Sequence, residues 1–187
     1  MNTAIRGSRE ASSRYSPLTG SIYSCQFFYG GWFLFHGLNY WVGFYFDKSV
    51  LPGPGLTPAL AASGVMGIVK ALEIVIGLAL LTDLFAALAI VAAWPITLMI
   101  AFVTASHLTP FGVSVAVIIV TLNAVMSFGH LDRYRAMLVP HAGPPAPGVP
   151  AGRSRDDRLP APLHIVGMLL GVGAAIAVTY LSMILLR

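Results

Sequence analysis

The sequence is too apolar for a soluble protein. Of its 187 residues, 57% are hydrophobic and only 10% are charged, and the mean hydropathy is +0.79. Soluble domains are about one quarter charged, so this composition excludes a soluble enzyme. It predicts an all-α integral membrane protein that crosses the cell inner (plasma) membrane several times.

Residues 1–19 are predicted to form a cytoplasmic N-terminal tail. They carry Arg6, Arg9 and Arg14 among many serines and lack the apolar core of a secretion signal. We therefore expect the first helix to be retained. Cys25 is the only cysteine, which excludes an internal disulfide and a multi-cysteine metal or redox centre.

Five apolar runs follow, and each reaches the roughly 20 residues that a membrane-spanning helix needs. They are approximately Gly20 to Phe46, Leu60 to Leu81, Leu84 to His107, Phe111 to Leu131 and Leu163 to Leu186. The first four predict a compact four-helix unit over residues 20–138. A linker rich in Pro and Arg, residues 139–162, would tether a fifth transmembrane helix, residues 163–187.

Three short joints predict where these helices begin and turn. Thr57-Pro58 and Thr109-Pro110 each place a hydroxyl at an N-cap and a proline at the first helical position, so they should start the second and fourth helices. Thr82-Asp83 is nearly the whole connection between the second and third helices. It predicts an antiparallel hairpin.

The distribution of arginine predicts the orientation, because positively charged short loops stay in the cytoplasm. With the N-terminus inside, only Lys48 and Arg187 lie outside, while the arginines of the tail and of the loop after the fourth helix lie inside. We therefore predict an N-in/C-out chain. Topology then accounts for the isoelectric point of 9.5, which is no argument for nucleic-acid binding, although the arginines could touch anionic lipid.

The first helix holds most of the aromatic residues, and its candidate ligand-binding residues are Trp32, His36 and Asn39. His36 and Asn39 share one face. They could bind a quinone head group or a proton, or they could form an interhelical hydrogen bond that orients the bundle. The rings could line a quinone, a carotenoid or a lipid. For Asn123 in the fourth helix, the interhelical hydrogen bond is the favoured alternative.

Lys70 and Glu73 are the strongest polar pair, because each charge costs about 2.5 to 3.5 kcal/mol at mid-membrane. Three residues apart, they can neutralise each other in a purely structural ion pair. Alternatively, Glu73 accepts a proton or anchors a polar ligand. His36 and His107 are the only pair of histidines suited to haem in the four-helix unit. Zinc is disfavoured, because no third ligand residue is clustered with these histidines.

The fifth helix carries Gly167, Gly171 and Ala174 at a spacing that lets another helix backbone approach closely. The partner is either the bundle of the same chain or another subunit. These residues are the predicted helix-packing set.

Two segments resemble the DoxX-like family of small four-helix membrane proteins. They are the segment 31–40, with Gly37, Leu38 and Asn39, and the segment 70–81, with Glu73 followed four residues later by Gly77. The resemblance covers roughly residues 20–135 and implies membrane redox assemblies, including quinone-linked ones. Two features depart from the family pattern: Tyr40 stands where a lysine is frequent, and the linker with its fifth helix is an addition.

Two functions are consistent with these features. The first is a non-catalytic accessory subunit of a larger membrane redox complex, respiratory or photosynthetic, that packs through transmembrane helices beside lipids and other membrane subunits. It would have no cofactor within the chain and would contact a quinone, pigment or lipid. The alternative is a stand-alone quinone-linked membrane oxidoreductase subunit or small transporter that uses Glu73, Lys70 and His36.

Overall fold

The computed structural model describes residues 17–45, 55–106, 109–131, 133–134 and 159–185, and all regular structure within these ranges is helical. Its helices are α2 (Pro17–Val42), α3 (Leu56–Ala62), α4 (Val65–Leu81), α5 (Ala86–Ser106), α6 (Pro110–Gly129) and α8 (Ala161–Leu185). Of these, α5, α6 and α8 are each long and apolar enough to cross a membrane. Helices α3 and α4 meet the same test only as one bent pair, and α2 is not among the helices that meet it.

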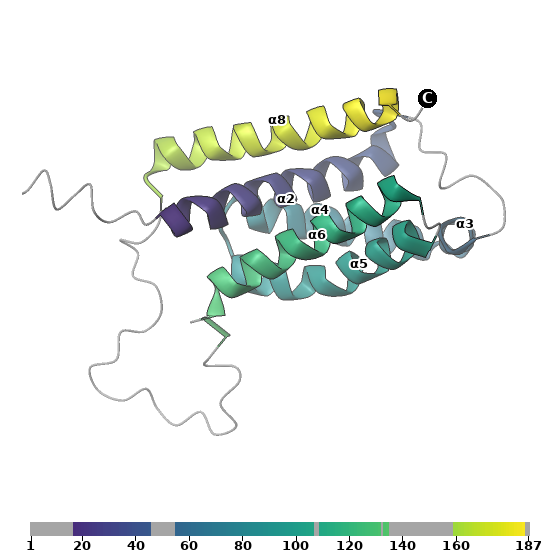
Figure 1. The fold of residues 1–187 in the computed structure, drawn as a ribbon, viewed down its shortest axis with the longest axis horizontal. Coiled ribbons are helices and arrows are strands. Elements are labelled where there is room, and N and C mark those ends of the chain that lie inside the picture. Colours follow the sequence, from purple (N-terminus) through teal and green to yellow (C-terminus); the bar gives the residue numbers. More distant parts are fainter. Residues whose placement is uncertain (1–16, 46–54, 107–108, 132, 135–158, 186–187) are drawn as a thin grey trace, which may run out of the picture.

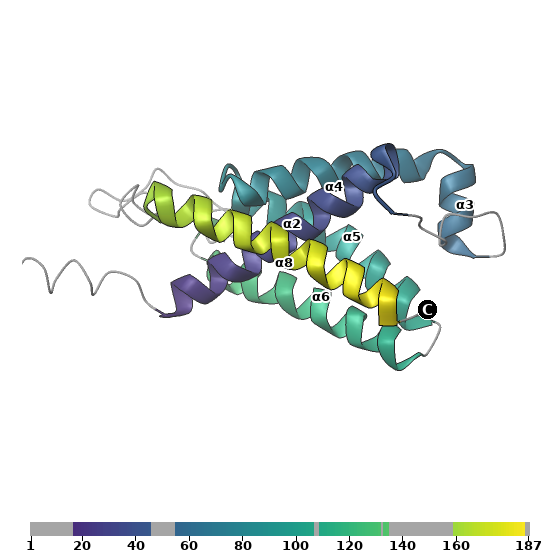
Figure 2. The same cartoon turned by 90° about the horizontal axis from the view of Figure 1, so that it is seen from above.

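Helix α2 lies at the centre of the bundle. Figure 1 shows it between α8 on one side and α4, α5 and α6 on the other, and Figure 2 shows α8 crossing it at an angle. The contact with α4 is close because both helices place a glycine there: a Cβ on Gly77 would lie 2.7 Å from the Leu34 nitrogen, and one on Gly30 would lie 3.0 Å from the Leu80 Cβ. The most aromatic helix is therefore the one that is most enclosed.

Helix α8 packs on α2 through the glycines that the sequence singles out. A Cβ on Gly167 would lie 2.7 Å from the Phe27 ring, and one on Gly171 would lie 2.5 Å from the Phe27 carbonyl carbon. Small residues here let the helices approach closely. The two glycines thus pack against the bundle of the same chain. Ala174, the third predicted packing residue, is exposed, and Ala175 is the buried residue of that turn.

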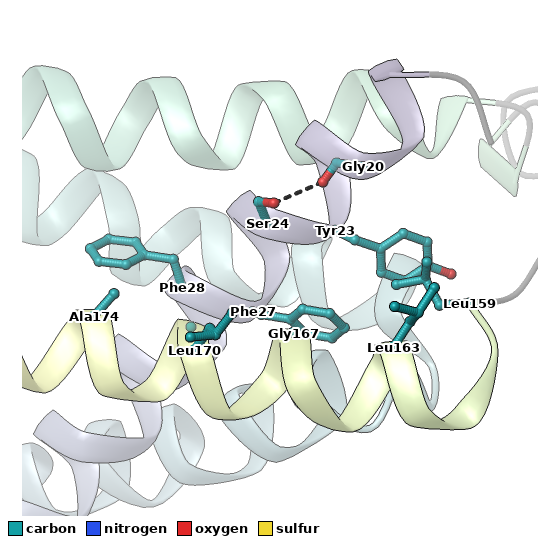
Figure 3. A pocket seen from close by; sticks show the side chains of 11 residues that line it. Gly20, Tyr23, Ser24, Phe27, Phe28, Leu159, Leu163, Gly167, Leu170 and Ala174 are labelled. Carbon is teal, nitrogen blue, oxygen red and sulfur yellow. Dashed lines mark hydrogen bonds between the residues drawn. The ribbon is translucent and has the colours of Figure 1, made fainter.

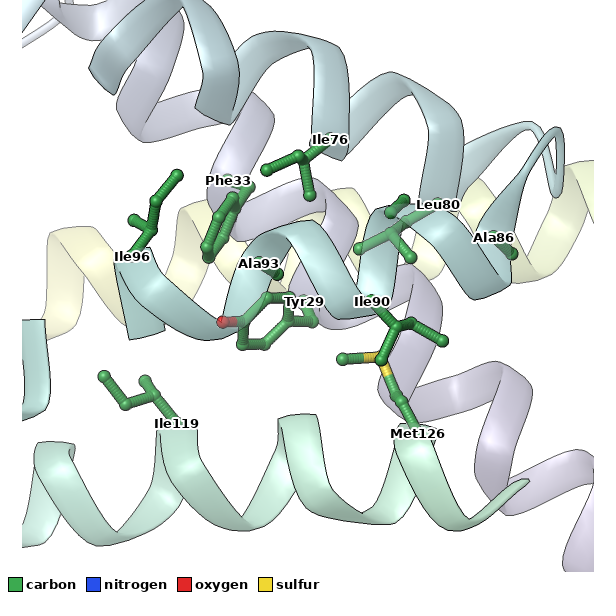
Figure 4. Packing of buried hydrophobic residues seen from close by; sticks show 11 residues of the cluster. Tyr29, Phe33, Ile76, Leu80, Ala86, Ile90, Ala93, Ile96, Ile119 and Met126 are labelled. Carbon is green, nitrogen blue, oxygen red and sulfur yellow. The ribbon is translucent and has the colours of Figure 1, made fainter. Parts of the chain in front are cut away.

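The core joins α2, α4, α5 and α6. Figure 4 shows Tyr29 and Phe33 of α2 packed between residues of the other three helices, which include Ile76, Leu80, Ile90, Ala93, Ile119 and Met126. The outer surface is equally apolar: Leu170 is 69% exposed, Phe102 70% and Phe128 71%. In contrast, several polar side chains are buried, namely Gln26, Asn39, Glu73, Asp83, Thr97, Asn123, His130 and Thr179. An apolar exterior around buried polar groups is what hydrocarbon surroundings favour.

The expected continuous helix from Leu60 to Leu81 is wrong. The chain breaks at Ser63 and Gly64, and α3 and α4 meet at 98°. Gly64 has φ +78°, a left-handed conformation that glycine adopts without the steric cost of a Cβ. A helix does begin near Thr57-Pro58, but it is the short α3, which starts at Leu56. The expected Thr57 cap is wrong, because the N-cap is Gly55 and no side chain caps the helix.

Two other joints agree with the sequence. Thr109 is the N-cap of α6, with Pro110 as its first residue, and the Thr109 hydroxyl accepts a hydrogen bond from the Gly112 N–H at 3.1 Å. Residues 82–85 connect α4 to α5, with Asp83 and Phe85 at positive φ. Most of the predicted 1–19 tail, most of the 139–162 linker and His107 lie outside the described residues, and α2 begins at Pro17, inside the predicted tail.

Candidate functional site

The ion pair predicted between Lys70 and Glu73 is present on α4. The Lys70 Nζ lies 2.8 Å from one Glu73 carboxylate oxygen and 3.0 Å from the other. Their spacing of three residues puts both side chains on one helix face. Glu73 is 2% exposed, whereas the Lys70 side chain is 16% exposed. The carboxylate is therefore enclosed by protein, and the ammonium group lies between it and open space.

That open space is a cavity of about 200 Å³ between α4 and α5, and α3 contributes to its lining. Lys70 and Glu73 contribute its charged groups, and Thr57 and Thr104 contribute hydroxyls. The rest of the lining is apolar: Leu60, Met66, Val69, Met99, Ile100 and Val103. We call this space the Lys70 cavity.

The Lys70 ammonium group offers one hydrogen-bond donor to a ligand in the Lys70 cavity. An ammonium group has three N–H bonds, and two of those of Lys70 are accounted for by the Glu73 oxygens. The Glu73 charge neutralises the ammonium charge. The cavity therefore favours a neutral acceptor, such as a carbonyl oxygen on an otherwise apolar molecule, over a free anion.

His36 and Asn39 form a second polar group, at the end of α2. The Tyr45 hydroxyl lies 2.7 Å from the His36 Nδ1, and the His36 Nε2 lies 3.3 Å from the Thr179 hydroxyl. The Asn39 carboxamide oxygen accepts the Tyr45 backbone N–H at 2.8 Å. We call these four residues the Tyr45 cluster.

The hydrogen bonds fix the tautomer of His36. The Thr179 hydroxyl donates its proton to the Ala175 carbonyl at 2.9 Å, so its oxygen must accept from the His36 Nε2–H. The Nδ1 is then the acceptor for the Tyr45 hydroxyl. Both ring nitrogens are engaged within the protein. Of the two alternatives for His36, this arrangement favours the hydrogen bond that orients the bundle over a ligand site.

Trp32 supports His36 and lies away from the Lys70 cavity lining. Its ring stacks on the imidazole with centroids 4.8 Å apart and planes at 23°. Four of the five predicted ligand residues thus divide between the Tyr45 cluster and the Lys70 cavity, and the fifth, Trp32, stacks on the Tyr45 cluster. Gly37 connects the two, since a Cβ on it would lie 2.9 Å from the Lys70 carbonyl oxygen.

A third polar group, not foreseen as a unit, runs through the core from α2 to α6. The Tyr29 hydroxyl bonds to the Thr97 hydroxyl, and the Asn123 amide donates to the same Thr97 oxygen at 3.0 Å. Thr97 itself donates to the Ala93 carbonyl at 2.7 Å, so Tyr29 is the donor in its bond to Thr97. The sequence favours a structural role for Asn123, and these contacts agree with that interpretation.

A fourth group, also missed, ties α2 to the turn between α4 and α5. The Gln26 amide donates to the Leu80 carbonyl at 2.8 Å and to an Asp83 carboxylate oxygen at 3.2 Å. The Tyr23 hydroxyl donates to the other Asp83 oxygen at 3.3 Å. His164 of α8 donates from Nε2 to the Leu81 carbonyl at 2.8 Å. The sequence feature that could have indicated this polar group is Gln26, a polar residue within an apolar run.

The described residues contain no group of metal ligands, and no known family matches the chain. Within the described residues, no three His, Cys, Asp or Glu side chains are grouped to hold a metal ion, and the His36–His107 haem prediction lies partly outside these residues. Comparison with family models, curated proteins and solved structures finds no match. The resemblance to the DoxX-like family stays a prediction that rests on its short motifs.

Proposed function

We propose that this chain is an accessory subunit of a larger membrane redox complex, respiratory or photosynthetic, in the cell inner membrane. The observation that carries the membrane part is the apolar exterior of α4, α5, α6 and α8 around buried polar groups. The redox part rests on the family resemblance. The accessory part is supported by the interior polar groups, which largely bond to one another and stabilise the bundle.

The proposed topology keeps five membrane crossings with the N-terminus inside. Helix α2 has 26 residues, about 39 Å at 1.5 Å per residue, which is enough to span the hydrocarbon. Its polar and aromatic residues lower its hydropathy, but its central position shields many of them from lipid. The bent α3–α4 pair supplies the second crossing. The arginine distribution supports the orientation.

Purification from native membranes in a mild detergent tests the accessory role. A membrane partner at a fixed stoichiometry, identified by mass spectrometry, is the expected result. Quinone-dependent turnover by the isolated, monodisperse chain would contradict it and favour the stand-alone oxidoreductase. An absorption spectrum of the same eluate would reveal a pigment.

The Lys70 cavity favours a quinone contact as part of the same function. A benzoquinone ring carries a neutral carbonyl acceptor on an apolar body, which matches the third Lys70 N–H and the methionine and aliphatic lining. The Tyr45 cluster is the weaker candidate, because both His36 ring nitrogens and the Asn39 carboxamide oxygen already bond to protein groups. We therefore place the quinone contact at Lys70 and Glu73.

Photolabelling with an azidoquinone tests this contact. Wild-type protein in nanodiscs should be labelled on peptides from α4 and α5, and a short-chain quinone should compete. The double variant Lys70→Met, Glu73→Leu removes both charges together and should lose the competed labelling. Ser114→Ala, on an exposed part of α6 away from the cavity, serves as the matched control. Equal competed labelling in the double variant would contradict the assignment.

A further inference from the structure

The lining of the Lys70 cavity includes a hydroxyl that the proposed quinone contact does not use. Of the two threonines that line the cavity, Thr104 donates its proton within its own helix, to the carbonyls of Ile100 at 2.8 Å and Ala101 at 3.2 Å. The Thr57 hydroxyl makes no hydrogen bond to any residue that the structure describes. Its proton is therefore available to a molecule in the cavity.

A larger cavity of about 460 Å³, between α2 and α8, offers no such group. Figure 3 shows its Ser24 hydroxyl bonded to the Gly20 carbonyl, at 2.9 Å. The Tyr23 hydroxyl, the other one in this lining, donates to Asp83 at 3.3 Å. The remaining lining is aromatic, aliphatic or glycine. The smaller Lys70 cavity is thus the better equipped of the two to bind a polar atom.

The bend between α3 and α4 brings Thr57 to the Lys70 cavity. Thr57 stands 13 residues before Lys70, so in one straight helix the two residues would lie about 20 Å apart along the axis. The chain instead breaks at Gly64, and α3 meets α4 at 98°. Figure 2 shows α3 turned away from the direction of α4 at one end of the bundle. As a result, Thr57 and Leu60 of α3 line the same space as Lys70.

A quinone ring has a second carbonyl oxygen that needs a donor of its own. Its first carbonyl accepts the third Lys70 N–H in the contact proposed above, and burying the second without a hydrogen bond would be costly. The Glu73 carboxylate only accepts hydrogen bonds, and the Thr104 proton is engaged. Among the lining side chains that the structure describes, the Thr57 hydroxyl is the second donor that remains.

We propose that Thr57 is a specificity-determining residue of the Lys70 cavity, and that its hydroxyl donates to a second acceptor oxygen of the molecule that bonds to Lys70. The cavity then selects apolar molecules with two acceptor oxygens over those with one. Helix α3 can adjust to the ligand, because glycines at positive φ, Gly55 and Gly64, flank it and none of its residues is buried. This proposal rests on the quinone contact proposed above.

Competition against azidoquinone labelling in nanodiscs measures this selectivity. The two competitors are a short-chain benzoquinone and a cyclohexadienone with the same side chain, which has a single carbonyl oxygen. We expect Thr57→Val to lower the ratio of their two affinities about fivefold relative to wild-type protein, the factor that one neutral hydrogen bond contributes. Thr57→Ser, which keeps the hydroxyl, should retain the wild-type ratio.

The ratio isolates the hydroxyl, because a disturbed cavity weakens both competitors alike. Thr104→Val is the matched comparison, since it removes a lining hydroxyl whose proton is already bonded, and it should leave the ratio at the wild-type value. An unchanged ratio in Thr57→Val, or an equal fall in Thr104→Val, would overturn this proposal while the quinone contact stands. Labelling of wild-type protein that neither competitor displaces would overturn the quinone contact and this proposal with it.

Discussion

The Lys70 cavity and the Tyr45 cluster are two polar groups in neighbouring parts of the bundle, and they differ in how many of their hydrogen-bonding atoms are engaged within the protein. In the Tyr45 cluster, both nitrogens of His36 and the carboxamide oxygen of Asn39 are engaged by protein groups. In the Lys70 cavity, a donor remains beside about 200 Å³ of open space. The difference lies both in the side chains, a charged pair against neutral groups, and in the open space beside them.

The largest expected effect comes from breaking the ion pair on one side. Glu73→Leu leaves the Lys70 ammonium without its counter-charge in apolar surroundings, which costs about 3 kcal/mol of unfolding free energy. The double variant Lys70→Met, Glu73→Leu removes both charges and should recover most of that loss. Reversible unfolding in mixed micelles measures both. Equal destabilisation by the single and double variants would show that the charges do not act as a pair.

The Tyr29–Thr97–Asn123 network extends the comparison to a second group of buried polar side chains that bond to one another. Thr97→Val keeps the side-chain volume but removes the acceptor shared by Tyr29 and Asn123. Leaving two buried donors unpaired should cost about 2 kcal/mol. The same unfolding assay measures it, and quinone labelling should not change. If Thr97→Val lowers the labelling while stability is unchanged, the Tyr29–Thr97–Asn123 network would belong to the ligand site.

His36→Phe tests the Tyr45 cluster directly. It retains the stacking surface for Trp32 but removes the bonds to Tyr45 and Thr179, and we expect a loss of about 1 kcal/mol because Tyr45 is partly exposed and can bond to water. Competed quinone labelling should persist. A loss of labelling as large as that of the Lys70→Met, Glu73→Leu variant would erase the distinction between the two regions.

The smallest effect concerns the end wall of the Lys70 cavity. Gly64 holds the bend between α3 and α4 at φ +78°, so Gly64→Ala should cost about 1 kcal/mol. Gly173→Ala, in a regular helix with free space around it, should be neutral or slightly stabilising. Thermal unfolding of the two variants checks this contrast. If α3 closes the cavity, Gly64→Ala should also weaken quinone competition.

Local sequence patterns predicted the helices well where a single residue decides the outcome. Thr109-Pro110 predicted the start of α6 because the cap and the proline act within one turn. The i,i+3 spacing predicted the contact between Lys70 and Glu73 for the same reason. Thr57-Pro58 carries the same signal but begins α3, because Gly64 allows a break that hydropathy does not reveal.

The sequence by itself predicted an apolar chain suited to a membrane and most of its helices, because both follow from composition and from interactions within a few residues. Only the tertiary structure decided which polar groups are satisfied. Tyr45 and Thr179 bond to His36, Thr97 joins Tyr29 to Asn123, and α8 packs against Phe27. These partners are far apart in the chain, and a hydrogen bond or a cavity depends on where packing brings them together.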